Sequence, residues 1–262
     1  MQAEAVINHI VGWLKDYAAS AGMQGFVVGV SGGVDSAVVS TLAAKTGLKT
    51  VLVEMPIHQP NDQVSRAQEH ITHLQQQFAN VDAMRADLSS TFDTFSLSVG
   101  APKQGTHNEQ LALANSRSRL RMVALYYFAQ VNGLLVAGTG NKVEDFGVGF
   151  FTKYGDGGVD ISPIADLLKS QVYELAAALD VPQSIQAAAP TDGLWENSPS
   201  DEEHIGASYP ELEWAMSVYD QHQAADFSGR EREVFEIYHR LHTVMQHKIK
   251  PIPVCEIPQK WL

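Results

Sequence analysis

The sequence predicts an α/β fold in which helices cover both faces of a doubly wound, mainly parallel sheet. Short, fully apolar segments alternate along the chain with longer amphipathic segments, and glycine or proline stands at most of the boundaries. Strands that are apolar on both sides must be buried on both sides, which is typical of a parallel sheet between two helical layers.

Each element follows from its own local pattern. Val6, Ile10, Trp13 and Tyr17 stand at near-helical spacing and predict a first helix, and Gly47 ends a second. The expected strands are 26–30 (FVVGV), 50–55 (TVLVEM), 81–86 and 134–137 (LLVA). The expected helices are 1–17, 35–46, 61–78, 108–131, 166–179, 210–220 and 231–247. The expected loops are 89–106 with a short helical piece, a mobile 146–158, and a polar 191–208.

The order of these elements also predicts the topology. Right-handed crossovers place the second and third strands on one side of the first strand and the fourth strand on the other. The boundary between the first and fourth strands is then a topological switch point, where ligands bind beyond the carboxyl ends of the strands.

Composition narrows the class of protein. The chain has 262 residues and a net charge of −12, without any run of Lys or Arg, so we expect one domain over 1–262 and no nucleic-acid partner. No apolar run suits a membrane span, and the N-terminus does not resemble a signal peptide, so we expect a cytoplasmic protein. Cys255 is the lone cysteine. His70 and His73, like His239 and His242, lack partners in a zinc pattern and are expected on solvated helix faces.

The turn after the first strand, GVSGGVDS from Gly29 to Ser36, is the first functional motif. Adjacent glycines, hydroxyl donors and a helix N-terminus together favour a phosphate chain. The segment resembles a Walker A loop in which Asp35 replaces the lysine, and a carboxylate beside phosphates implies Mg²⁺. Two alternatives are a purely structural turn and a hydrolase nucleophile elbow, G-x-S-x-G. The elbow needs several preceding strands, and the chain before Phe26 has room for one helix.

The second motif, GTGNKVE from Gly138 to Glu144, follows the fourth strand directly. In the expected topology it meets the first turn, so Glu144 can share the metal with Asp35 and Thr139 can contact a nucleotide. The structural alternative is a helix capped by Thr139 or Asn141 with Glu144 in its first turn, and both interpretations can hold together.

At this point the sequence resembles a known superfamily, the N-type ATP pyrophosphatases, on its SGGVDS segment, and within it the NAD synthetases. FFTKYGDGGVD at 150–160 resembles the specific segment of that family, and ISP at 161–163, Lys169, PTD at 190–192 and HK at 247–248 continue the match in order. The resemblance spans about 25–250 and implies an adenine nucleotide alpha hydrolase-like, Rossmann-like fold. Two departures stand out: one more residue lies between Glu144 and Phe150 than in the family pattern, and 192–208 differs from the commoner form.

The resemblance implies three groups of site residues and a catalytic set. Mg²⁺ is expected on Asp35 and Glu144. Contacts to ATP are expected from Gly29, Val30, Ser31, Gly32, Gly33, Val34, Asp35, Ser36, Thr139, Lys169 and Thr191. Contacts to deamido-NAD are expected from Arg119, Lys153, Asp160, His247 and Lys248. The expected catalytic residues are Asp35, Lys153, Asp160 and Lys169. Arg117 and Arg121, which flank Arg119, are expected to form a solvated stripe.

The implied reaction is ATP-dependent amidation of deamido-NAD by ammonia through an adenylated carboxylate, with release of AMP and pyrophosphate. Glutamine-using relatives carry an extra domain with a nucleophilic cysteine, and Cys255 lies in the C-terminal tail, so free ammonia is the expected nitrogen donor. The resemblance also implies a homodimer. The alternatives are another ATP pyrophosphatase of this signature, such as a GMP-synthetase-like ligase, and a non-catalytic nucleotide-binding module.

Overall fold

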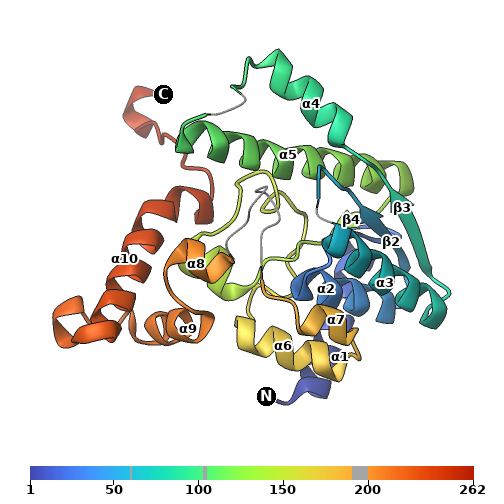
Figure 1. Ribbon diagram of the computed structural model, residues 1–262, viewed down its shortest axis with the longest axis horizontal. Helices are drawn as coiled ribbons and strands as arrows, with labels where there is room; N and C mark the ends of the chain where they lie inside the picture. The colour runs from blue at the N-terminus through green and yellow to red at the C-terminus, as the bar shows by residue number, and fades with distance from the viewer. Residues whose placement is uncertain (60, 103–104, 191–199) are drawn as a thin grey trace.

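A computed structural model describes residues 1–59, 61–102, 105–190 and 200–262. Four strands and a series of helices follow one another along the chain (Figure 1). The strands are β1 (Gly25–Gly29), β2 (Lys49–Glu54), β3 (Val81–Arg85) and β4 (Leu135–Val136). The helices are α1 (Ala3–Ser20), α2 (Val34–Lys45), α3 (Asn61–Gln77), α4 (Ser89–Ser98), α5 (His107–Asn132), η1 (Lys142–Val148), α6 (Lys169–Ala178), α7 (Gln183–Gln186), α8 (Asp201–Ile205), α9 (Tyr209–Val218), η2 (Ala224–Asp226), α10 (Gly229–Ile249) and η3 (Gln259–Trp261).

The strands form one parallel sheet in the order β3-β2-β1-β4, which confirms the predicted topology. Val27 in β1 is the register partner of Val51 in β2 and of Val136 in β4. A single bridge between Ala137 and Ile161 continues the β4 edge. The carboxyl ends of β1 and β4 are therefore neighbours, and the segments that follow them start from one edge of the sheet.

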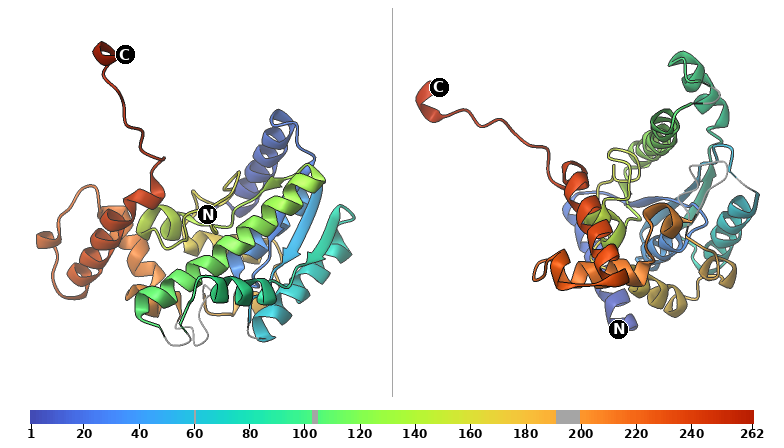
Figure 2. Two further views of the ribbon diagram at one scale, coloured as in Figure 1. Left: turned by 90° about the horizontal axis from the view of Figure 1, so that it is seen from above. Right: turned by 60° about the vertical axis from the view of Figure 1, so that its left-hand side comes forward.

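Helices cover both faces of the sheet, as expected (Figures 1 and 2). Alternate residues of β1 enter different cores: Val28 packs in the cluster that includes α1, α2 and α6, whereas Val27 packs in the cluster on the α5 side. Leu42 and Leu175 are fully buried in the first cluster, and Ala129 of α5 is buried in the second. Strands β1, β2 and β4 are thus sandwiched between two apolar layers, whereas β3 at the edge is exposed from Asp82 to Arg85.

A third core lies beside the sheet, where α9 and α10 pack against η1 (Figure 1). Val143 of η1, Leu212 of α9 and Tyr238 of α10 are buried together in it. Because η1 follows the turn after β4, this core fixes one wall of the switch point.

Three expectations differ from the structure. The 191–208 loop prediction is wrong at 201–205, which form the short helix α8, and residues 191–199 lie outside the described part. Segment 146–158 begins within a helix, since η1 extends to Val148. His70 is not on a solvated face: it is fully buried, and its Nε2 lies 2.8 Å from the Oγ of Ser40 in α2. The prediction of a solvated face failed because α3 packs the side that carries His70 against α2.

The chain after α10 leaves the body as an extended tail, and Cys255 on it is exposed (Figure 2). Among the described helices, none combines the length and the apolar character that a bilayer crossing requires.

Candidate active site

The turn between β1 and α2 has a conformation that requires glycine. Gly32 has a φ of +85°, and a Cβ there would lie 2.6 Å from the carbonyl oxygen of Gln63. Ser36 braces the turn by donating from Oγ to the carbonyl of Gly33 at 2.9 Å. Gly33 caps α2 without a side-chain acceptor, which leaves the first amides of α2 to an anion.

The turn after β4 is tied to the first turn by Asn141. The Oδ1 of Asn141 caps η1 by accepting from the amides of Val143 at 3.2 Å and Glu144 at 3.1 Å. Its Nδ2 donates to the Oδ1 of Asp35 at 3.0 Å. The structural interpretation of this motif is confirmed at Asn141, whose side chain caps η1 and also joins the two turns.

Asp35 and Glu144 face one another across a single ammonium group. The Nζ of Lys169, at the start of α6, donates to Asp35 Oδ2 at 2.6 Å and to Glu144 Oε1 at 2.8 Å. The Lys169 side chain is 3% exposed, and the two carboxylates are 17% and 15% exposed. The topology thus brings both acidic side chains into one cleft, as the sequence predicts.

The three charges respond differently to burial. For Asp35, burial outweighs the attraction of Lys169 and raises its pKa. For Glu144, burial is outweighed by Lys169 and by the hydroxyl of Tyr209, so its pKa is lowered. Burial alone would lower the pKa of Lys169, but the two carboxylates raise it above its usual value. The ammonium therefore stays charged and serves as counter-ion to both acids.

Two further side chains, Tyr209 and Asp201, adjoin the pair formed by Asp35 and Glu144. Tyr209 of α9 donates a short hydrogen bond to Oε1 of Glu144, and its hydroxyl lies 3.4 Å from Oδ2 of Asp201 in α8. Burial, followed by the charges of Glu144 and Asp201, raises the pKa of Tyr209, so the phenol remains a donor. Neither Tyr209 nor Asp201 was singled out from the sequence, because both lie far along the chain from the glycine motifs.

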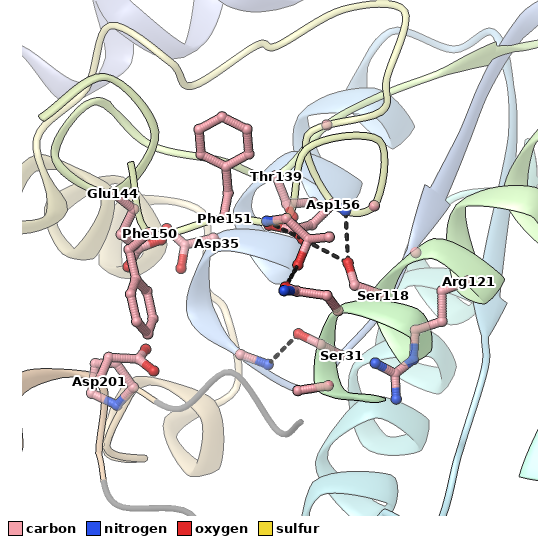
Figure 3. Close-up of a pocket in the computed structure, with 18 of the residues that line it drawn as sticks. Ser31, Asp35, Ser118, Arg121, Thr139, Glu144, Phe150, Phe151, Asp156 and Asp201 are labelled. Atoms are coloured by element: carbon pink, nitrogen blue, oxygen red, sulfur yellow. Dashed lines mark hydrogen bonds between the residues drawn. The ribbon is translucent and has the colours of Figure 1, made fainter. Parts of the chain in front are cut away.

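A cavity of about 840 Å³ opens over the two turns and extends to α10. Figure 3 shows Asp35 and Glu144 at one side of it, Arg121 at the other, and Asp201 nearby. Most of the residues predicted for the site line this cavity. They are Gly29, Val30, Ser31, Gly32, Gly33, Val34, Asp35, Thr139, Glu144, Lys169, His247 and Lys248.

Four predicted residues, Ser36, Arg119, Lys153 and Asp160, are not among the described residues that line the cavity. Ser36 lies behind the turn that it braces. Arg119 is exposed and donates from Nε to the carbonyl of Lys153 at 3.3 Å, and Lys153 itself donates to the carbonyl of His247 at 2.5 Å. The carboxylate of Asp160 accepts from the amide of Val136 at 2.8 Å and the hydroxyl of Tyr126 at 3.0 Å. Thr191 lies outside the described residues. The roles of these residues stay predictions.

Arg121 lines the cavity, although the sequence favoured Arg119 and a solvated stripe. Its Nε donates to the carbonyl of Met55 at 3.0 Å and its Nη2 to the Oε1 of Gln59 at 2.9 Å. Arg117 packs over Phe92, with its guanidinium carbon 4.2 Å from the ring centroid. The helical phase could have separated Arg121 from Arg119, but only the position of β2 shows which of the two faces the cavity.

The GDGG segment forms a cross-braced wall of the cavity (Figure 3). The Oδ1 of Asp156 accepts from Ser118 Oγ at 2.6 Å and from the amide of Thr152 at 3.0 Å. Thr152 in turn donates to Oδ1 of Asn115 at 2.7 Å. A Cβ on Gly155 would lie 2.2 Å from Ser118 Oγ, so this glycine allows the wall to approach α5. The sequence analysis expected 146–158 to be a mobile loop and found a family-specific segment at 150–160, but it did not indicate these contacts.

The donor set around Lys169 fits a divalent cation. Two carboxylates already converge on one positive charge, and Mg²⁺ prefers one or two carboxylates combined with phosphate oxygens and water. Within the described residues no group of three or more His, Cys, Asp or Glu gathers into a closed metal cage. The arrangement therefore suits a cation that arrives with phosphates.

Comparison with known proteins agrees with this geometry. The family model described as NAD synthase matches residues 6–251. The chain is 38% identical over 258 residues to the NH(3)-dependent NAD(+) synthetase of Carboxydothermus hydrogenoformans, covering 97% of each chain. It is 35% identical over 249 residues to the synthetase of the same name from Mesoplasma florum, covering 95% of each. The solved NMN synthetase of Francisella tularensis superposes with a TM-score of 0.84 at 33% identity, with 99% of each chain covered. A nucleotide-type cavity over two glycine turns, together with these full-length matches, places the chain in the NAD synthase family.

Proposed function

We propose that the chain is an ammonia-dependent NAD synthetase, a ligase that amidates the nicotinate carboxylate of deamido-NAD at the expense of ATP. The observation that carries the proposal is that Asp35 and Glu144 both contact the ammonium group of Lys169 beside the glycine-rich turn after β1. The curated relatives named above carry this activity in their names. Two partly buried acids that share the ammonium group of Lys169 favour a catalytic site over a non-catalytic nucleotide-binding module.

The chemistry needs ATP because a carboxylate has no good leaving group for ammonia. The amides of Ser31–Val34 and the N-terminus of α2 are proposed to bind the ATP phosphates, with Thr139 on the nucleotide and Lys169 on the departing pyrophosphate. Mg²⁺ bound at Asp35 and Glu144 would neutralise charge that develops on the pyrophosphate. The substrate carboxylate attacks the α-phosphorus, and pyrophosphate leaves.

Ammonia then attacks the acyl adenylate, and AMP departs as the amide forms. No protein nucleophile enters either step, so the site needs to orient reactants and exclude water. His247 and Lys248 are proposed to contact deamido-NAD, and both line the cavity. Asp160 is retained as the candidate for orienting ammonia, and Thr191 as an ATP contact.

We propose a homodimer in which Arg119 and Lys153 contact the dinucleotide across the interface. Val123, Tyr127 and Val131 are 59%, 64% and 66% exposed and follow Arg119 at intervals of four along α5. One helix face thus combines an apolar stripe with the predicted substrate arginine, which explains why Arg119 points away from the cavity of its own chain. A Tyr127→Glu chain that stays dimeric by light scattering would contradict this interface.

A second candidate substrate is nicotinate mononucleotide. The specific observation in its favour is the similarity to the Francisella tularensis NMN synthetase, which is above that expected for fold alone. Both substrates present the same nicotinate carboxylate, and they differ in whether an adenylate is attached.

The direct test is AMP release from ATP, Mg²⁺ and ammonium with each candidate acid. We expect release with deamido-NAD and NAD as product, and little with xanthosine monophosphate, whose acceptor oxygen belongs to a ring carbonyl and not to a carboxylate. Faster turnover with nicotinate mononucleotide would assign the second candidate, and no release with either acid would refute both.

We further propose that residues 1–262 act as one synthetase unit, supplied with free ammonia, in the cytoplasm. The family match over 6–251 supports the single unit. The acidic composition with one cysteine is consistent with a reducing compartment.

A further inference from the structure

Tyr209 connects the α9–α10 core to the proposed metal ligand. Its side chain is buried, its hydroxyl contacts Glu144 and Asp201, and its ring centroid lies 4.9 Å from the Nζ of Lys169. The hydroxyl has one proton, so the shorter contact to Glu144 takes the stronger bond and Asp201 receives the weaker arm. Tyr209 thus contacts Glu144 of η1, Lys169 of α6 and Asp201 of α8.

The oxygen that Tyr209 contacts is the one shared with Lys169. Oε1 of Glu144 accepts from both groups, and the two donors differ in character. The ammonium is the group proposed to turn to pyrophosphate, whereas the phenol is neutral and is anchored in a packed core. If the lysine turned to the pyrophosphate, Tyr209 would remain as a donor to the carboxylate.

Tyr209 is itself held rigidly. Its amide donates to Glu202 Oε1 of α8 at 2.7 Å, and the preceding Ser208 donates from its amide to Glu211 Oε2 at 2.8 Å in a capping box. Arg230 of α10 holds Glu211 from the other side at 2.7 Å. A phenylalanine would fill the same space, so the hydroxyl is explained by its acceptors and not by packing.

We propose that Tyr209 is a positioning residue that fixes the carboxylate of Glu144 for the divalent cation. The inference rests on the proposed metal site. Tyr209 touches no substrate and makes no bond in the reaction. Partners that orient a metal ligand typically change metal affinity about 10–100-fold when they are lost.

The test is Mn²⁺ binding by Tyr209→Phe, measured by the spin resonance of free Mn²⁺ in the presence of an ATP analogue that cannot be cleaved between its α- and β-phosphates. We expect affinity to fall about 10–100-fold, and the Mg²⁺ concentration for half-maximal AMP formation to rise by a similar factor. The matched control is Tyr238→Phe. Tyr238 is 2% exposed in the same core and does not contact Glu144, so its variant should bind Mn²⁺ as the wild type does.

The outcomes separate this inference from the proposed function. Unchanged Mn²⁺ affinity in Tyr209→Phe overturns the positioning role, even if turnover falls. A wild-type enzyme that binds no Mn²⁺ and needs no Mg²⁺ refutes the metal site and, with it, the role of Tyr209. If Tyr209→Phe does not fold, Tyr209→Met replaces it with another apolar side chain that lacks the hydroxyl; we expect a loss of affinity in the same range, and no loss overturns the proposal.

Discussion

The turns after β1 and β4 stand side by side at the switch point, yet they are built differently. The first, Gly29–Ser36, gets its shape from its own residues: Gly32 has the left-handed conformation and Ser36 braces the carbonyl of Gly33. The second runs into a π-helix, and its acid, Glu144, is set by groups from α6 and α9. The first turn is a local structure, whereas the second depends on tertiary contacts. Substitutions at distant positions should therefore disturb the second turn more than the first.

The largest effect is expected at the joint between the two turns. Lys169→Met leaves Asp35 and Glu144 buried without their counter-ion, so the free energy of unfolding should fall by about 3–5 kcal/mol. Chemical denaturation in EDTA measures this loss. Saturating Mn²⁺ should recover part of it, since a divalent cation can replace the ammonium. A melt that Mn²⁺ leaves unmoved would argue that the carboxylates do not form a cation site.

The next effect tests whether the turns share one cation. Asp35→Asn and Glu144→Gln should each lower kcat/KM for AMP formation by about 10²–10³-fold, because each removes a charge that acts on the phosphates. The double variant should lose little more than either single variant, since one ion serves both ligands. Fully multiplicative losses would mean that the two acids act independently.

His70 contacts Ser40 in α2, the helix that follows the first turn, and its burial makes the free energy of unfolding depend on pH. Burial, aided by His73, lowers its pKa from 6.5 to about 4. Between those values the unfolded chain takes up a proton that the folded chain refuses, so stability falls as pH drops below 6.5, by roughly 3 kcal/mol in all near pH 4. Urea unfolding between pH 4 and 7 should show this slope, and His70→Gln should flatten it. If the His70→Gln variant keeps the same slope, groups other than His70 cause the loss of stability in acid.

The smallest effect compares the two helix caps. Asn141→Ala removes the cap of η1 and the bond to Asp35, and should lower the free energy of unfolding by about 1–2 kcal/mol. Gly33→Ala is the matched change at the first turn. Its φ of −96° suits alanine, and a Cβ there would meet Ser31 Oγ only at 3.4 Å, so we expect a change within about 0.5 kcal/mol. Equal losses would erase the contrast between the turns.

The same contrast explains how far sequence predicts this fold. The strand order follows from apolar segments and crossover rules, and it is confirmed. Helix 108–131 is visible in its pattern, and the structure has it as α5 with a Thr106 capping box. The local sequence does not show which polar side of a helix another helix will cover. His70 in α3 was therefore assigned to a solvated face, although α2 packs over it.

For the site, the sequence predicts residues whose spacing is local and misses those brought in by packing. The phosphate-type turn, Glu144 and Lys169 belong to recognisable segments and meet as expected. Tyr209 and Asp201 reach Glu144 from sequence positions with no motif of their own. Arg121 was passed over for Arg119, because helical phase alone does not say which face a sheet will cover.

The π-helix η1, which contains Glu144, also bears on how this segment tolerates changes in length. Hydrogen bonding of the i→i+5 type winds one more residue into a turn than an α-helix does. We therefore expect the surplus residue between Glu144 and Phe150 to be accommodated inside η1, so that the side chains before and after it keep their facing directions. Removing one residue from 145–148 should relax the turn to ordinary α geometry while leaving both ends anchored. We therefore expect insertions and deletions of one residue at this position to leave the cleft unchanged, and a homologue with one residue fewer to present the same acid to the same ion.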